Sequence, residues 1–284
     1  MRALQSIYAW TGILLLILIM LPVMGIVRLF DRSAARSVTG RTFRTMGSWM
    51  TYINPVWTIS RTGSLPENRR GPYVVVCNHQ SNADIPVISR LPWEMKWVGK
   101  KSLFQLPVAG WLMRLSDDIP VDRKDPESRA AVVRRAREVI GHGVSVMFMP
   151  EGTRSRDARV LRYQDGAFRL AVETGTPVLP LAIDGTSEAL PTQGWQFGHA
   201  DVRLHVFDPV QTADLTVADV PALRERVRQM TVEQIAAWRG VPVTEVDAAP
   251  EQQEVLSDTS RLGAEARTIG TGEDGAKSAH MEPG

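Results

Sequence analysis

The 284-residue sequence predicts an α/β fold, a mixed sheet flanked by helices, with an N-terminal membrane-embedded helical segment. Short runs of β-branched and apolar residues alternate with segments of helical spacing through the middle of the chain, which indicates a sheet covered by helices. No charged residue stands between Arg2 and Arg28. As a helix, such a stretch is long enough to cross a hydrocarbon core of about 30 Å.

The N-terminal apolar segment admits three interpretations. Pro22 and Gly25 would tilt or kink a helix, so a re-entrant or interfacial hairpin stands beside a membrane span. A cleaved signal peptide is the third, but Arg28 and Arg32 separate the apolar run from the small residues 33–35. One arginine precedes the segment and five follow it, so the positive-inside rule predicts the inner membrane with a cytoplasmic main domain. The five are Arg28, Arg32, Arg36, Arg41 and Arg44.

Residues 42–60 carry apolar side chains at spacings of three and four, which predicts one apolar helical face. These side chains are Phe43, Met46, Trp49, Met50, Ile53, Val56 and Trp57. The face could pack against a protein core or lie at the membrane interface, where tryptophan is favoured. The neighbouring apolar segment favours the interface.

The soluble body contains four predicted strands, at 73–77, 144–149, 178–183 and 202–207. Helical spacing covers 102–115, 126–140 and 218–239, and Pro126 suits an early helical position. Helices between apolar strands predict a mixed or parallel sheet covered by helices. The single cysteine, Cys77, cannot form an internal disulfide, and we interpret it as a strand residue rather than a nucleophile.

Charge and composition divide the chain into three parts: membrane-associated helices at 1–60, an α/β domain at 61–240 and an acidic tail at 241–284. Residues 1–240 hold 30 basic and 22 acidic side chains, whereas the tail holds three basic and nine acidic side chains. The basic body favours anionic partners, and the membrane segment favours lipid over nucleic acid. The tail is predicted to be disordered. Its glycine motif at 270–275 has no strand before it and is not a phosphate loop.

A histidine and an aspartate follow the first of these strands, at His79 and Asp84. Five residues apart, they would point about 140° apart on a continuous helix, so they can meet only if the chain turns. The intervening polar residues favour a turn, and Pro86 suits the start of a helix. A carboxylate that orients an imidazole makes a general base. The spacing alone is a weak signal, since a turn histidine bonded to an acid has the same pattern.

Several cations and a glycine loop lie where other predicted strands end. Gly152 permits close backbone approach, Thr153 offers a hydroxyl and Arg154 a forked cation suited to phosphate, while Glu151 could hold that arginine or receive a substrate hydroxyl. Two further cations are Lys101 and Arg123. Any one could be a solvated surface charge, but several at strand ends predict a convergent anion site.

Together these blocks resemble the lysophosphatidic acid acyltransferase family, the 1-acylglycerol-3-phosphate O-acyltransferases. The resemblance runs over roughly residues 70–210, through Asn78-His79 to Asp84, Lys100 to Leu103, Val121-Asp122-Arg123, Phe148 to Ser155 and Pro177 to Leu181. It implies that His79 is the catalytic base and Asp84 its partner. It also implies that the phosphorylated acceptor is bound by Lys101, Arg123, Glu151, Gly152, Thr153 and Arg154. Pro120 and Met149 depart from the usual pattern, and both affect pocket shape.

The resulting hypothesis is a single transfer from acyl-CoA or acyl carrier protein to the sn-2 hydroxyl of 1-acylglycerol-3-phosphate, giving phosphatidic acid. It requires no metal and no cofactor beyond the acyl thioester. Backbone amides of the turn from His79 to Asp84 are candidates for stabilising the oxyanion. Two alternatives stand beside it: an acyltransferase for another acceptor, such as a lyso-ornithine lipid, another lysophospholipid or glycerol 3-phosphate, and a non-catalytic membrane adaptor.

Overall fold

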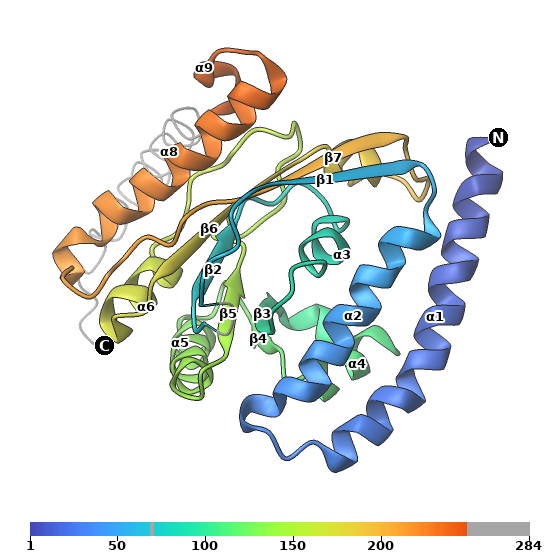
Figure 1. The fold of residues 1–284 in the computed structure, drawn as a ribbon, viewed down its shortest axis with the longest axis horizontal. Coiled ribbons are helices and arrows are strands. Elements are labelled where there is room, and N and C mark those ends of the chain that lie inside the picture. Colours follow the sequence, from blue (N-terminus) through green and yellow to red (C-terminus); the bar gives the residue numbers. More distant parts are fainter. Residues whose placement is uncertain (69–70, 249–284) are drawn as a thin grey trace, which may run out of the picture.

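The computed structural model describes residues 1–68 and 71–248, and its centre is a seven-stranded mixed sheet (Figure 1). The strand order is β1-β7-β6-β2-β5-β3-β4. Strands β2 to β6 run parallel, β7 is antiparallel to β6, and β1 is parallel to β7. The bounds are β1 Trp57–Gly63, β2 Val74–Cys77, β3 Met95–Lys100, β4 Ile119–Val121, β5 Ser145–Phe148, β6 Val178–Asp184 and β7 Ala200–Val206. The predicted fold class is confirmed.

Helices cover both faces of the sheet (Figure 1). Alternate residues of β2 face opposite sides: Val74 and Val76 join one apolar cluster and Val75 and Cys77 the other. The first face carries α5 Pro126–Gly141, α6 Gly166–Thr174 and α8 Val220–Arg239, and the second carries α3 Asp84–Ile88 and α2 Ser37–Ile53. The remaining helices are α1 Arg2–Phe30, α4 Ala109–Leu115, α7 Thr186–Ala189 and α9 Val243–Val246, with short 3₁₀ turns at Ala34–Arg36, Lys101–Gln105 and Val217–Asp219.

Three strands lie outside the sequence prediction, and each lacks a long β-branched run. Strand β4 has only three residues, with a proline at its centre, and β3 includes Lys96. Strand β1 is a mostly polar edge strand, and it begins inside the stretch predicted as one helix over 42–60. That prediction is wrong beyond Ile53, because Asn54-Pro55 ends the helix and places Trp57 in the sheet. The helix predicted over 102–115 is also interrupted, at Pro107.

Helix α1 is long and apolar enough to cross a membrane, and only 11% of its most apolar 18-residue stretch is buried. A helix that belongs to a soluble core would be covered on most sides. One side of α1 does pack against the protein, through a small cluster in which Met20 and Met24 meet Met46 of α2 and Leu112 of α4. Its first turns are held by Arg2 and Trp10, which donate to the backbone carbonyls of Phe197 and Trp195.

Helix α2 is fixed to the sheet by buried charges. Arg44 Nη2 lies 2.6 Å from Asp118 Oδ2, with both side chains almost fully buried. Lys96 Nζ is buried beside Glu94 Oε1 at 2.8 Å and also donates to the carbonyl of Ser116. Charges buried in this way hold a unique arrangement because losing one partner leaves the other unpaired. The buried side of α2 therefore belongs to the protein core, while Trp49 and Tyr52 remain exposed.

The folded body continues past the expected boundary at residue 240. Helix α9 follows directly, Val246 is fully buried, and the backbone of Val160 pairs with that of Val246 and Ala248. Arg228 of α8 binds Asp247 at 2.8 Å. Residues 241–248 are thus part of the domain rather than of a tail. The predicted disorder and the glycine motif at 270–275 lie outside the described residues.

Gly40 of α2 provides a test of this close packing. A Cβ on Gly40 would overlap the buried Glu94 carboxylate and Lys96 ammonium. We expect Gly40→Ala to lower the free energy of unfolding by about 1–3 kcal/mol, as overpacking of a core does. Thermal unfolding in detergent measures the change.

Gly25→Ala is the matched control for this substitution. Gly25 also lies inside a helix, but nothing is within 4 Å of the added methyl group. This variant should gain up to about 1 kcal/mol from helix propensity. Gly40→Ala melting as high as Gly25→Ala would show that α2 does not pack this tightly.

Candidate active site

The turn after β2 is fixed to the neighbouring strand by a side chain. Asn78 Nδ2 donates to the carbonyl of Ile183 on β6, and the backbone N–H of Ile183 donates to Asn78 Oδ1, both at 2.9 Å. The asparagine side chain therefore forms the hydrogen bonds that a further backbone pair between β2 and β6 would form. This directs the following residue, His79, out of the carboxyl edge of the sheet.

The turn brings together the histidine and aspartate that the sequence predicted to meet. His79 Nδ1 lies 2.7 Å from Asp84 Oδ2, and the side chain of Asp84 is fully buried. The same oxygen accepts the backbone N–H groups of Gln80 and Ser81 at 2.9 and 3.1 Å. These bonds fix the carboxylate, so the neutral imidazole carries its proton on Nδ1 and presents Nε2 as the basic nitrogen. The His79 side chain is 13% exposed.

The loop after β5 holds the backbone of His79 from both sides. Glu151 Oε1 accepts the His79 N–H at 3.0 Å, and Ser155 N–H donates to the His79 carbonyl at 2.8 Å. The histidine thus has its ring fixed by one segment and its main chain by another. The sequence motifs include Asn78 and Ser155 but assign no role to either residue. Asn78 stands directly before His79 and Ser155 directly after Arg154, and these positions alone do not show that the two residues hold the turn.

Glu151 does not lie where the sequence interpretation put it. Its carboxyl group is buried beneath the turn, and the structure shows no bond between it and Arg154. Burial raises the pKa of Glu151 well above its ordinary value, and the Asp84 carboxylate adds to this, against hydrogen bonds from the backbone of His79 and Leu161. Glu151 positions His79 from within the fold, a different role from holding a substrate hydroxyl.

Five of the six amides in the turn from His79 to Asp84 already donate hydrogen bonds within the protein. The N–H groups of Gln80 and Ser81 donate to Asp84, and that of His79 donates to Glu151. Ala83 and Asp84 donate to the side chain and the carbonyl of Ser81. The turn uses these five amides to build the histidine–aspartate pair, so within residues 79–84 only the Asn82 N–H is left for a substrate oxygen.

The topology places the predicted anion site at the same edge as His79. Parallel strands β2, β5, β3 and β4 are consecutive neighbours, so their carboxyl ends share one edge. Arg154 follows β5, Lys101 follows β3 and Arg123 follows β4. The register pairs Lys100 with Val121, so the segments that follow β3 and β4 leave the sheet side by side. At about 4.8 Å per strand, the row from β2 to β4 spans about 14 Å.

These three cations have no anionic partner within residues 1–68 and 71–248. Several other arginines in that part of the chain are paired with carboxylates, as Arg135 is with Asp117 and Arg239 with Asp184. Lys101 and Arg123 are exposed and Arg154 is half-buried. Partial desolvation lowers the pKa of Arg123, because surrounding protein displaces water without supplying a negative charge. A row of unpaired cations beside a base is suited to an anionic substrate.

The remaining predicted residues line the same loop. Gly152 has a positive φ of 71°, a conformation that favours glycine, and Thr153 is exposed beside it. A cavity of about 290 Å³ adjoins the turn on the β6 side, with Gln80, Ser155 and Arg156 in its wall. Cys77 is completely buried and burial raises the pKa of its thiol, so it is a core residue. Within the described residues, no group of three or more potential ligands could hold a metal ion.

Comparison with known proteins gives a consistent result. Residues 59–184 match the family model described as Acyltransferase. A chloroplastic 1-acyl-sn-glycerol-3-phosphate acyltransferase of Brassica napus is 39% identical over 140 residues, 49% of this chain and 41% of the relative. The human 1-acyl-sn-glycerol-3-phosphate acyltransferase alpha is 34% identical over 159 residues, 55% of this chain and 56% of the relative.

The crystal structure of the 1-acyl-sn-glycerophosphate (LPA) acyltransferase PlsC from Thermotoga maritima superimposes with a TM-score of 0.70 at 25% identity, covering 84% of this chain and 96% of that one. The chain therefore contains an acyltransferase domain and is similar in sequence and fold to lysophosphatidic acid acyltransferases. The resemblance drawn from the motifs is therefore confirmed. The chain spans about half the length of the curated relatives that it matches.

The raised pKa of Glu151 gives this protein a testable pH dependence. A carboxyl group whose pKa is higher in the folded state favours folding below its unfolded pKa of about 4.3, and the contribution is lost as pH rises through the folded value. Glu151→Gln removes the ionisation and keeps an acceptor for the His79 N–H. We expect its stability relative to wild type to increase as pH rises from 5 to 8 in thermal unfolding. A difference that does not change with pH would contradict the assignment.

Proposed function

We propose that this chain transfers an acyl group from an acyl thioester to the sn-2 hydroxyl of 1-acylglycerol-3-phosphate, forming phosphatidic acid. The observation that carries this proposal is the 2.7 Å contact between His79 Nδ1 and buried Asp84, at the edge that also presents unpaired Arg123 and Arg154. Relatives named for this activity support it. A base and an anion site together fit an acceptor that carries both a hydroxyl and a phosphate.

The reaction is one group transfer without a protein nucleophile. His79 Nε2 takes the proton of the acceptor hydroxyl as its oxygen bonds to the thioester carbonyl carbon. Asp84 stabilises the imidazolium that forms. When the tetrahedral intermediate collapses, the carbon–sulfur bond breaks and the thiolate takes the proton from Nε2. An ester replaces the thioester, and the histidine is neutral again.

The acceptor phosphate lies on the row of cations. Arg154 leaves the strand next to β2, so it is the cation nearest in the sheet to His79, and Lys101 and Arg123 follow. Guanidinium groups fit phosphate through paired hydrogen bonds. Holding the phosphate fixes the position of the hydroxyl relative to Nε2, which turns an encounter of two molecules into an oriented reaction. Gly152 and Thr153 complete the wall of this site.

The membrane supplies the acceptor and receives the product. Helix α1 exposes large apolar side chains along its length and packs on α2 and α4, so the domain is held beside the lipid surface. We propose that the catalytic domain faces the cytoplasm, where acyl-CoA or acyl carrier protein delivers the acyl group. The arginines that follow α1 favour this orientation.

Substitution of His79 tests the base. We expect His79→Ala to reduce thiol release from acyl-CoA with 1-acylglycerol-3-phosphate by about 10²–10⁴-fold, the range that general acid–base groups contribute. Asp84→Asn should lose activity as well, because the amide cannot stabilise the imidazolium. His142→Ala, at an exposed position beyond α5, is the control and should keep wild-type turnover. Full activity of a folded His79→Ala protein would exclude His79 as the base.

Substitution of Arg123 tests the phosphate site separately from the base. Loss of a hydrogen bond to a charged group costs about 1.5–3 kcal/mol, so Arg123→Gln should raise KM for 1-acylglycerol-3-phosphate by about tenfold or more. The KM for acyl-CoA should change less. Arg134→Gln, an exposed arginine on α5, removes the same charge elsewhere. An equal effect of both substitutions would mean that only overall charge matters.

A further inference from the structure

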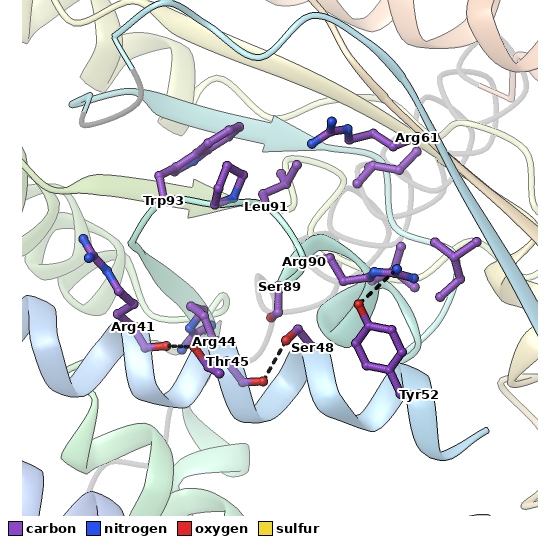
Figure 2. Close-up of a pocket in the computed structure, with 14 residues that line it drawn as sticks. Arg41, Arg44, Thr45, Ser48, Tyr52, Arg61, Ser89, Arg90, Leu91 and Trp93 are labelled. Atoms are coloured by element: carbon purple, nitrogen blue, oxygen red, sulfur yellow. Dashed lines mark hydrogen bonds between the residues drawn. The ribbon is translucent and has the colours of Figure 1, made fainter. Parts of the chain in front are cut away.

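A second basic cavity lies away from the histidine–aspartate pair. It has a volume of about 550 Å³ and is enclosed by α2, β1 and the segment that follows α3 (Figure 2). Figure 2 shows side chains from all three elements around it, among them Arg41, Arg44, Tyr52, Arg61, Arg90 and Trp93. No residue of the proposed acceptor site lines this cavity.

The cavity wall is strongly basic. Four arginines line it, from three separate segments of the chain, and no aspartate or glutamate does. Arg44 is neutralised by Asp118, whereas Arg41 and Arg61 have no carboxylate partner within residues 1–68 and 71–248. Arg90 stacks on Tyr52 and donates to its hydroxyl at 3.3 Å. Arginines converging on a cavity without carboxylates attract an anion.

Two buried N–H groups in the same wall have no partner. Arg44 and Trp93 are each 4% exposed, and neither Arg44 Nε nor Trp93 Nε1 has an acceptor in the described protein. Buried polar groups are almost always hydrogen-bonded, so each such donor calls for an explanation. Both nitrogens are closed off from solvent, so an occupant of the cavity would have to displace the side chains around them to reach them. The charges that favour an anion here are those of Arg41, Arg61 and Arg90, none of which has a carboxylate partner within the described residues.

We propose that this cavity binds a phosphate group, carried either by an anionic lipid or by a soluble molecule. Guanidinium groups match the oxygens of phosphate. The volume is far larger than the roughly 30 Å³ share of one water molecule, so a phosphate with an attached glycerol fits. The site is distinct from the acceptor site and goes beyond the proposed function, since it needs no acyl transfer.

The cavity lies between the catalytic pair and the apolar helix α1. Asp84 is the first residue of α3, and Val87 of the same helix lines the cavity, so one short helix connects the cavity to the catalytic pair. On its other side, α2 packs against α1, the apolar helix. A phosphate bound here would therefore contact the helices that border both the membrane and the active site.

Calorimetric titration of the full-length protein in an uncharged detergent tests the proposal with two probes, dihexanoyl phosphatidate below its micelle concentration and inorganic phosphate. The test variant is Arg41→Gln/Arg61→Gln. The matched control is Arg134→Gln/Arg226→Gln, which removes the same charge from exposed positions on α5 and α8. A third variant, Arg123→Gln, weakens the acceptor site instead.

The expected result is binding that weakens by about tenfold or more in Arg41→Gln/Arg61→Gln, stays within about twofold in the control, and survives in Arg123→Gln. Binding of phosphatidate alone identifies a lipid headgroup, and binding of both probes identifies phosphate itself. The proposal is overturned if wild type binds neither probe, if the test variant binds like wild type, or if the control weakens equally. Binding that only Arg123→Gln removes belongs to the acceptor site and also overturns it.

Discussion

The contact between His79 and Asp84 depends on a chain reversal directly after a buried parallel strand. Asn78 locks the end of β2 to β6, the amides of Gln80 and Ser81 close on Asp84, and Asp84 in turn begins α3. The loop after β5 then holds the main chain of His79. Strand, turn, helix and loop therefore all share one small network. Because the Asp84 carboxylate is completely buried, removing any part would leave polar groups without partners.

The sheet explains why residues scattered over the sequence form one site. His79, Lys101, Arg123 and Arg154 follow four different strands, and only parallel alignment of those strands brings their ends to one edge. The cations remain unpaired at this edge, while several arginines on the covering helices, such as Arg135 and Arg224, bind carboxylates. The stability of the fold and the charge of the site are thus supplied by different arginines.

The sequence predicts the buried strands well because they carry a local signal. Strands β2 and β6 are apolar runs, β5 is mostly apolar and β7 alternates apolar with polar residues, and the ends of all four agree with the prediction to within two residues. Strands β3 and β4 depend on pairing partners instead: Lys96 is buried in β3 only because Glu94 and the Ser116 carbonyl receive its charge. The meeting of His79 with Asp84 was predictable from turn-forming residues. The burial of Glu151 was not, because no local pattern shows that its carboxyl group reaches back to the turn.

In the proposed reaction, the site selects an acceptor by its phosphate and deprotonates its hydroxyl with His79. Competition between equal concentrations of 1-acylglycerol-3-phosphate and 1-acylglycerophosphocholine for a labelled acyl thioester tests it most directly. Both acceptors offer an sn-2 hydroxyl, but only the first carries an exposed phosphomonoester for the unpaired cations at the carboxyl edge. We expect the label to accumulate in phosphatidic acid. Equal or preferred labelling of phosphatidylcholine would contradict it.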